Sequence, residues 1–137
     1  MEDRYLYKAK TTPKEKGEFN NVWVAGNLIV SNGKYYIHPV GNVVNVKNEI
    51  GRIIVMHEVI PDTICRCTGR EDRNGKLIWE NDIVKINNSK VNTVIAFRDF
   101  EIICTIPNEK YYKHRLEYDT EYEVIGNTFD NPELLEV

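Results

Sequence analysis

The sequence has no apolar run that approaches the roughly 20 residues a membrane-spanning helix needs. Its first residues, Met1 to Tyr5, contain no apolar signal core, so we expect a protein that is not secreted. Only three cysteines are present, and an odd number without an export signal argues against a disulfide framework. These absences predict a location in a reducing cytoplasm and no membrane partner.

Residues that favour helices are scarce. Six leucines and three alanines stand against 14 valines and 15 isoleucines, whose β-branched side chains suit strands. Fifteen asparagines and eight glycines supply residues that tolerate positive φ in tight turns. A length of 137 residues corresponds to one ordinary domain or two small ones. We therefore expect a mainly β chain of short antiparallel strands, with an N-terminal β region at 1–60 and a second region at 61–137.

Short turn signals separate the β-rich runs. Asn32-Gly33 predicts a tight hairpin, because both central positions of such a turn need positive φ. Asn74-Gly75 predicts a second hairpin, and Arg98-Asp99 separates two long alternating runs that should form a third. Gly26-Asn27 predicts a bend or bulge within the run from 22 to 30. Further strands are expected at 5–9, 43–46, 52–60, 64–68 and 122–125.

Alternation of apolar residues along these runs directs one face toward a core. The predicted core consists of Ile78, Trp79, Ile83, Val84, Ile95, Phe97, Ile102, Cys104, Val124 and Ile125. In the paired tyrosines Tyr35-Tyr36 and Tyr111-Tyr112 only one ring of each pair can face inward on a strand, so the other should face solvent or a partner.

Three blocks of sequence carry a family resemblance. They are Thr68-Gly69 with the Asp-Arg-Asn-Gly-Lys turn at 72–76, the Trp-Glu-Asn-Asp-Ile-Val box at 79–84, and the words Tyr-Glu-Val-Ile-Gly-Asn at 122–127 and Asn-Pro-Glu-Leu-Leu at 131–135. In this order they resemble the YopX family of phage and prophage proteins, over residues 61–135 more than over the first 60. Asn81 stands where the family usually has Gly, and Asn is the commonest other residue at positive φ.

The resemblance implies a small β protein of a bacterial host cell, encoded by a phage or prophage. It also implies that the C-terminal part resembles an SH3-like barrel, packed on the N-terminal β region. The family has no established activity to carry over. The residues of the turn and the box that we expect to shape this part are Thr68, Gly69, Asp72, Asn74, Gly75, Trp79, Glu80 and Asp82.

The carboxylates of this region could be read as a metal or acid–base cluster. A calcium loop, however, needs an acid where the chain has Arg70 and a Glu where it has Asn81. We therefore expect Asp72 to open the turn through a side-chain hydrogen bond to the backbone, and Asp82 to fix the corner of the box in the same way.

Other catalytic or metal-binding patterns are weak. Cys65 and Cys67 lie on one strand face with Cα atoms too far apart for an easy disulfide. Cys104 and the three histidines are scattered, so no zinc spacing is present, and we expect no metal and no cofactor. The two serines lie in turns without a nucleophile elbow. A Cys-His pair that meets only in space stays open.

Charge is unevenly distributed along the chain. Residues 117–137 hold seven acids and no base, which is a charge of −7. Because the whole chain has a net charge of −3, residues 1–116 carry +4. Basic and aromatic residues that could hold phosphates or a second subunit are Arg66, Arg70, Arg73, Lys76, Lys110, Tyr111, Tyr112, Lys113 and Arg115. Solvated loops that offset the acidic segment explain the same residues, and a pI near 5.7 disfavours strong DNA binding.

Three functional interpretations follow. We expect first a non-enzymatic accessory protein that assembles with itself, as a homo-oligomer, or binds a partner. The second interpretation is a weak nucleic-acid-binding module, in which phosphates meet the basic hairpin around Asn74-Gly75. The third is a small enzyme of unknown reaction, which only the unassigned cysteines and histidines support.

Overall fold

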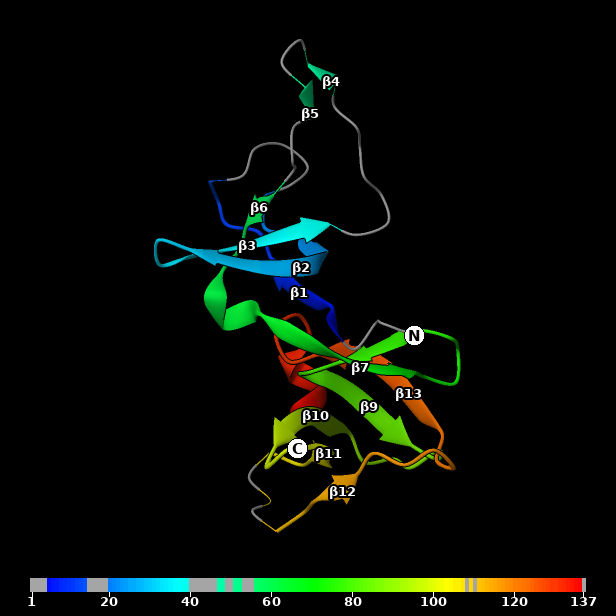
Figure 1. Ribbon diagram of the computed structural model, residues 1–137. Coiled ribbons are helices and arrows are strands. Elements are labelled where there is room, and N and C mark those ends of the chain that lie inside the picture. Colours follow the sequence, from blue (N-terminus) through cyan, green and yellow to red (C-terminus); the bar gives the residue numbers. More distant parts are fainter. Residues whose placement is uncertain are drawn as a thin grey trace. The chain divides into compact units, whose positions relative to one another are not determined.

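The computed structural model describes residues 5–14, 20–39, 47–48, 51–52, 56–107, 109 and 111–136. The chain folds into two compact units, Arg4–Arg66 and Cys67–Val137, whose boundary falls inside strand β7 (Cys65–Glu71). The helical structure of the described residues is confined to short 3-10 turns, among them η3 (Pro61–Thr63) and η4 (Pro132–Leu135). A search of these residues finds no helix with the length and apolar character to cross a membrane. The prediction of a mainly β, antiparallel chain is confirmed (Figure 1).

The N-terminal unit is an antiparallel sheet in the order β6-β3-β2-β1. Its strands are β1 (Tyr7–Lys10), β2 (Trp23–Ser31), β3 (Lys34–Pro39) and β6 (His57–Glu58), and the first residues of β7 pair with β1. A single bridge between Thr11 and Val59 also links the segments that follow β1 and β6. A separate two-residue ladder joins β4 (Lys47–Asn48) to β5 (Gly51–Arg52). The predicted strand at 43–46 lies outside the described residues.

The hairpin predicted at Asn32-Gly33 is confirmed. Asn32 has φ 53° and Gly33 has φ 72°, and the turn joins β2 to β3 in continuous register. The inner face of this sheet is built on buried Ala9, Ile37 and Val59. Five half-buried side chains pack against these three: Tyr7, Val24, Leu28, Tyr35 and Ile64.

The bend or bulge predicted at Gly26-Asn27 is wrong. Gly26 pairs with Tyr7 on one side and with Pro39 on the other, without a shift of register. Glycine is needed there for another reason, since a Cβ atom would lie 2.0 Å from the carbonyl oxygen of His38. The sequence signal therefore marked a close approach of two backbones instead of a bend.

The C-terminal unit contains an antiparallel sheet in the order β12-β11-β10-β9-β13. Its strands are β9 (Asp82–Ile86), β10 (Thr93–Arg98), β11 (Glu101–Thr105), β12 (His114–Arg115) and β13 (Tyr122–Asn127). Beside it, the later residues of β7 pair with β8 (Leu77–Trp79). Among the described residues β12 and β13 remain separate edges, so the sheet is not a closed barrel.

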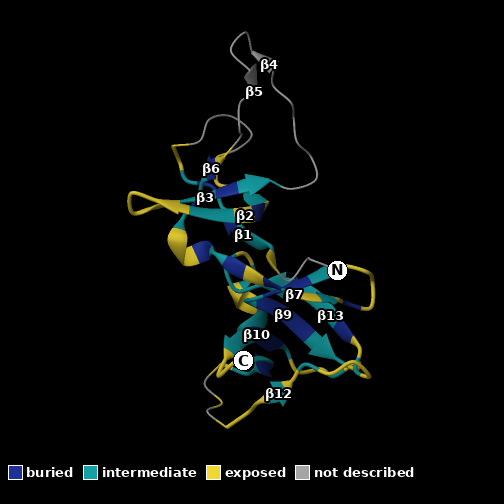
Figure 2. Ribbon diagram, in the orientation of Figure 1, coloured by how far each residue is buried: buried dark blue, intermediate teal, exposed yellow. Residues whose placement is uncertain are grey.

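The core of this unit is formed by Ile78, Val84, Ile95, Cys104 and Tyr122, which are at most 1% exposed. Figure 2 shows the buried part of β9 in dark blue. Of the predicted core residues, Trp79 and Ile83 are buried as well. The remaining four are half-buried: Phe97, Ile102, Val124 and Ile125. The prediction missed Tyr122, and it missed Val94 and Ile103 because it assigned only one buried face to β10 and β11.

Candidate functional site

Asp72 organises the turn between β7 and β8. Its carboxylate accepts hydrogen bonds from the backbone N–H groups of Asn74 and Lys76, at 2.8 and 2.9 Å, and from that of Val124 at 3.0 Å. Burial raises the pKa of Asp72, but these three donors and the charge of Lys76 lower it, and the net pKa lies below the ordinary value. The side chain predicted to open the turn thus also attaches the turn to β13.

The turn is longer than a two-residue Asn-Gly hairpin. Gly75 has φ 80°, whereas Asn74 does not have a positive φ. The backbone N–H of Asp72 donates to the carbonyl of Lys76 at 2.7 Å, and the N–H of Gly75 donates to the carbonyl of Asp72. The turn therefore spans 72–76 and leaves Asn74, Gly75 and Lys76 exposed. Its conformation depends on the aspartate as well as on the glycine.

The corner of the box is fixed by a second buried carboxylate. Asp82 is 2% exposed and accepts a hydrogen bond from the backbone N–H of Trp79 at 2.8 Å. Asn81 adopts φ 70°, the left-handed conformation expected where the family usually has Gly. Its N–H donates to Ile95 and its carbonyl accepts from Thr128, so the corner joins β10 to the segment after β13. Glu80 is half-buried.

Thr68 and Gly69 lie at an irregularity of β7. The register between β7 and β8 shifts between Cys67 and Glu71. The hydroxyl of Thr68 donates to the carbonyl of Ile78 at 2.7 Å and accepts from the N–H of Arg70 at 3.1 Å. Within the described ranges, no group of three or more His, Cys, Asp or Glu side chains is arranged to hold a metal ion. The polar side chains of turn and box make backbone hydrogen bonds that shape this part of the unit.

Arg70 contacts the acidic segment of its own chain. Its guanidinium lies 4.9 Å from the ring centroid of Tyr118 and 5.5 Å from that of Tyr122. It also donates to the carbonyl oxygens of Tyr118 and Thr120, at 3.3 and 3.5 Å. Arg73 donates to the side-chain oxygen of Asn88 at 2.9 Å. Both arginines therefore have partners within the C-terminal unit.

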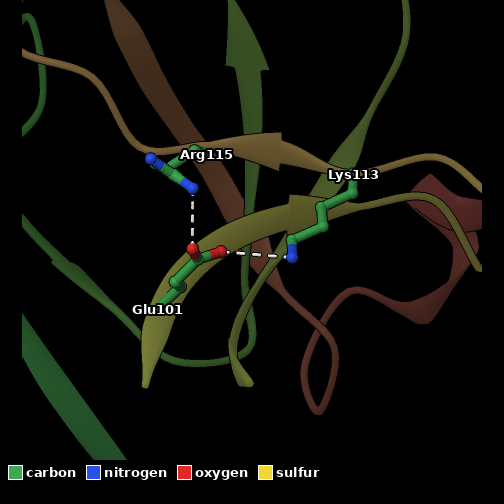
Figure 3. A network of polar contacts seen from close by, with 3 residues as sticks. All are labelled: Glu101, Lys113 and Arg115. Carbon is green, nitrogen blue, oxygen red and sulfur yellow. Dashed lines mark hydrogen bonds and ion pairs between the residues drawn. The ribbon is translucent and has the colours of Figure 1, made fainter. Parts of the chain in front are cut away.

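Lys113 and Arg115 converge on one carboxylate, that of Glu101 (Figure 3). The Lys113 Nζ atom lies 3.1 Å and the Arg115 guanidinium 2.7 Å from its oxygens. The hydrogen bond from Lys113, followed by the charges of both bases, lowers the pKa of Glu101 although partial burial opposes this. Glu101 lies on β11 and Arg115 on β12, and Lys113 directly precedes β12. Exposed ion pairs of this kind contribute little stability.

The remaining predicted contact residues do not form one group. Arg66 is exposed in the N-terminal unit, and Lys76 is exposed on the turn of the other. Tyr111 is 89% and Tyr112 37% exposed. Lys110 lies outside the described residues. The predicted basic and aromatic contact residues therefore lie in separate places and do not form one surface among the described residues.

Comparison with known families identifies a match over almost the full length of the chain. The family described as YopX protein matches residues 3–136, nearly the whole chain. The chain belongs to the YopX family. The match also takes in the first 60 residues, where the resemblance of individual motifs is weak. No curated protein matches the chain.

The three cysteines of this YopX family member are buried, and none of them forms a disulfide. Burial raises the pKa of the Cys104 thiol to about 11, against a lesser opposing effect of the Thr93 hydroxyl. Such a thiol is protonated at neutral pH and is a poor nucleophile. His114, on the strand paired with that of Cys104, has a ring nitrogen 3.3 Å from the hydroxyl of Tyr122. That hydroxyl also accepts from the backbone N–H of Glu117 at 2.9 Å, so His114 and Tyr122 help to hold the loop before β13.

Two features of this YopX chain were missed by sequence reasoning. The turn of the third hairpin is Asp99-Phe100, one residue later than predicted, and both residues have positive φ, 51° and 65°. In the N-terminal unit the amino groups of Lys8 and Lys10 lie 4.8 and 5.5 Å from the ring centroid of Trp23. The second feature follows from the β1–β2 register, which no local sequence signal specifies.

Proposed function

We propose that this YopX family member is a phage or prophage accessory protein without enzymatic activity, which assembles with itself or binds a partner protein. The observation that carries the proposal is the exposure of large aromatic side chains in the C-terminal unit. Phe100 is fully exposed, Tyr118 is 91% exposed and Tyr111 is 89% exposed. Aromatic residues are enriched in protein interfaces, where a rigid ring contributes area at low entropic cost.

The polar groups of the same unit support a binding role. Asp72 and Asp82 accept backbone hydrogen bonds, and Cys104 has a raised pKa. These groups stabilise the fold, whereas the exposed rings do not contribute to its core. A location in the bacterial cytoplasm and an SH3-like character of the C-terminal part belong to this proposal and stay predictions.

Molar mass tests the proposal. Light scattering at increasing protein concentration and low salt should give a mass above the 16.0 kDa of one chain. A mass of one chain at every concentration would remove the self-assembly half of the proposal and leave partner binding. Binding by a partner is then tested with proteins encoded beside the gene, purified and mixed pairwise with the chain.

A second candidate function is weak binding of single-stranded nucleic acid, favoured by the arrangement of Lys8 and Lys10 around Trp23. Two cations beside an aromatic ring can hold a phosphate and stack a base. Fluorescence anisotropy of a labelled oligonucleotide tests this candidate. The affinity should fall as the salt concentration rises. The fall should be less steep in the variant Lys8→Gln/Lys10→Gln, because each lost phosphate contact reduces the slope of log affinity against log salt concentration by about one.

A further inference from the structure

The turn between β10 and β11 has an unusual composition. Arg98 pairs with Glu101, so Asp99 and Phe100 are the two central residues of the hairpin. Both have positive φ, as a type I′ turn requires. Asn and Gly are the residues that normally occupy such positions, and a bulky side chain there is an outlier. Phe100 is therefore held in a backbone conformation that its side chain disfavours.

The ring of Phe100 is also fully exposed to solvent. It contributes no buried area to the core of its own unit, so packing does not compensate for the strained φ. Gly at position 100 would remove both the strain and the exposed apolar area. Strained residues that the fold does not need are concentrated at functional sites. These two independent observations indicate that Phe100 serves a contact outside the chain.

A second exposed ring, that of Tyr118, lies on the segment that follows β12. The backbone N–H of Leu116 donates to the carbonyl of Ile102 at 3.1 Å, which extends the pairing of β11 and β12 toward Phe100 and Tyr118. Tyr118 is 91% exposed. Phe100 and Tyr118 each lie two residues from this backbone contact, on adjoining segments of the C-terminal unit, and a partner that covers these segments can bury both rings.

We propose that this end of the unit is a self-association surface, in which Phe100 packs against Phe100 and Tyr118 of a second copy of the chain around a two-fold axis. The inference rests on the proposed function and specifies its interface. Arg98 and Asp99, both exposed, are neighbours of opposite charge on the turn. Across a two-fold axis the arginine of one copy faces the aspartate of the other, so the surface is complementary to itself.

A nucleic acid fits this surface less well. In the sequence, Glu117 and Asp119 flank Tyr118 and Asp99 precedes Phe100, whereas the Arg70 guanidinium beside the Tyr118 ring already donates to the carbonyl oxygens of Tyr118 and Thr120. Carboxylates repel the phosphate groups that dominate the affinity of proteins for nucleic acids. A second copy, which brings Arg98 and apolar rings of its own, is the better occupant.

The variant Phe100→Gly tests the inference in the full chain. It should raise the melting temperature, because Gly tolerates the left-handed conformation, and it should weaken self-association. We expect the dissociation constant of the oligomer, measured by sedimentation velocity, to rise at least about tenfold. The control Val91→Ser removes an exposed apolar side chain elsewhere in the unit and should leave the dissociation constant unchanged.

The outcomes separate the inference from the function on which it rests. An oligomer that is as tight in Phe100→Gly as in the unchanged protein overturns the inference and leaves self-assembly in place. A chain that is monomeric at every concentration overturns the inference together with the self-assembly half of the proposed function, and leaves partner binding. An oligonucleotide that binds the unchanged protein but not Phe100→Gly assigns the surface to nucleic acid and overturns the second copy as occupant.

Cross-linking gives a second measurement that does not depend on stability. The native cysteines are buried, so a cysteine in the variant Asp99→Cys, which keeps the Phe100 ring, is the exposed thiol available to an oxidant. Two such thiols close to a two-fold axis should form an intermolecular disulfide when Cu(II)-phenanthroline and oxygen accept the electrons. The variant Asn74→Cys places a thiol on the exposed turn at 72–76 and should give much less dimer. Equal yields from both variants would overturn the proposed interface.

Discussion

The carboxylate of Asp72 accepts a hydrogen bond from the backbone N–H of Val124 at 3.0 Å, across 52 positions of the chain. The next residue along the turn adds a backbone–backbone hydrogen bond to the same strand, since the N–H of Arg73 donates to the carbonyl of Tyr122 at 2.8 Å. Both partners lie on β13, at an edge of the five-stranded sheet. The turn therefore occupies backbone groups that would otherwise be open to pairing with another chain.

The variant Asp72→Ala tests this role. It leaves the N–H groups of Asn74, Lys76 and Val124 without their carboxylate acceptor, so we expect the free energy of unfolding to fall by about 3 kcal/mol. Urea unfolding followed by circular dichroism gives this value. The control Asn74→Ala changes an exposed residue of the same turn and should alter stability by no more than about 0.5 kcal/mol. A loss below about 1 kcal/mol in Asp72→Ala would contradict the assigned role.

Acid should weaken the same attachment. The pKa of Asp72 lies below its ordinary value of 3.8 in the folded protein. A group with a depressed folded pKa contributes stability that is fully present above its unfolded pKa and is lost as the pH falls through the folded pKa. The stability difference between the unchanged protein and Asp72→Asn should therefore be constant above about pH 5 and should shrink below pH 4. A difference that stays constant down to about pH 2 would show that Asp72 is not the titrating group.

Trp79 provides a test of the core. Its side chain is 8% exposed, and its backbone N–H is bound by Asp82. Trp79→Ala should lower the free energy of unfolding by about 3–5 kcal/mol, because it leaves a large cavity. Trp79→Phe refills most of the volume and should recover more than half of that loss. A loss below about 1 kcal/mol in Trp79→Ala would instead make the ring a candidate contact for a partner.

Gly26 tests the close approach of β2 and β3. Because a Cβ atom would lie 2.0 Å from the carbonyl oxygen of His38, Gly26→Ala must displace one of the two backbones. We expect a loss of about 2–3 kcal/mol by thermal unfolding. Gly33→Ala is the matched control, since its Cβ atom would meet no neighbour within 4 Å. Its positive φ should cost only about 1 kcal/mol. Equal losses would indicate that backbone conformation, and not contact, makes Gly26 necessary.

Local signals in the sequence specified part of this fold. The Asn32-Gly33 turn could be predicted because both central residues tolerate positive φ, and a hairpin turn involves only four consecutive residues. The Asp99-Phe100 turn could not, because Phe100 disfavours that conformation and the register of β10 and β11 imposes it. The amino-acid composition could not distinguish these two turns, because it contains no information on which residues of two strands pair.

The candidate site shows the same division between local and distant interactions. That Asp72 hydrogen-bonds within its turn was predictable from its position before Asn-Gly. Its bond to Val124 was not, because it depends on the packing of distant strands. Tyr122 was missed for a similar reason. Its flanking residues are acidic, and its burial depends on contacts with Glu117, His114 and Arg70 that only the folded chain brings together.

Arg70 holds the loop before β13, and its replacement should loosen that loop without unfolding the protein. Arg70→Ala removes the donors to Tyr118 and Thr120 and the cation beside the Tyr118 ring. We expect faster hydrogen exchange at residues 117–121 and a loss of global stability below about 1 kcal/mol, since the guanidinium is only half-buried. Arg70→Lys keeps the charge but not the planar fork of donors, so it should restore slow exchange only in part.

Arg73→Ala is the matched control, because Arg73 contacts Asn88 and not the loop. Its exchange at 117–121 should equal that of the unchanged protein. Variants of Arg70 and Arg73 also separate a role of these arginines in holding the loop from a role in assembly. If the protein forms oligomers through attraction between this turn and the acidic segment of a second copy, Arg73→Glu should dissociate them while the loop stays ordered. Fast exchange at 117–121 in Arg73→Ala, or slow exchange in Arg70→Ala, would show that Arg70 does not hold the loop.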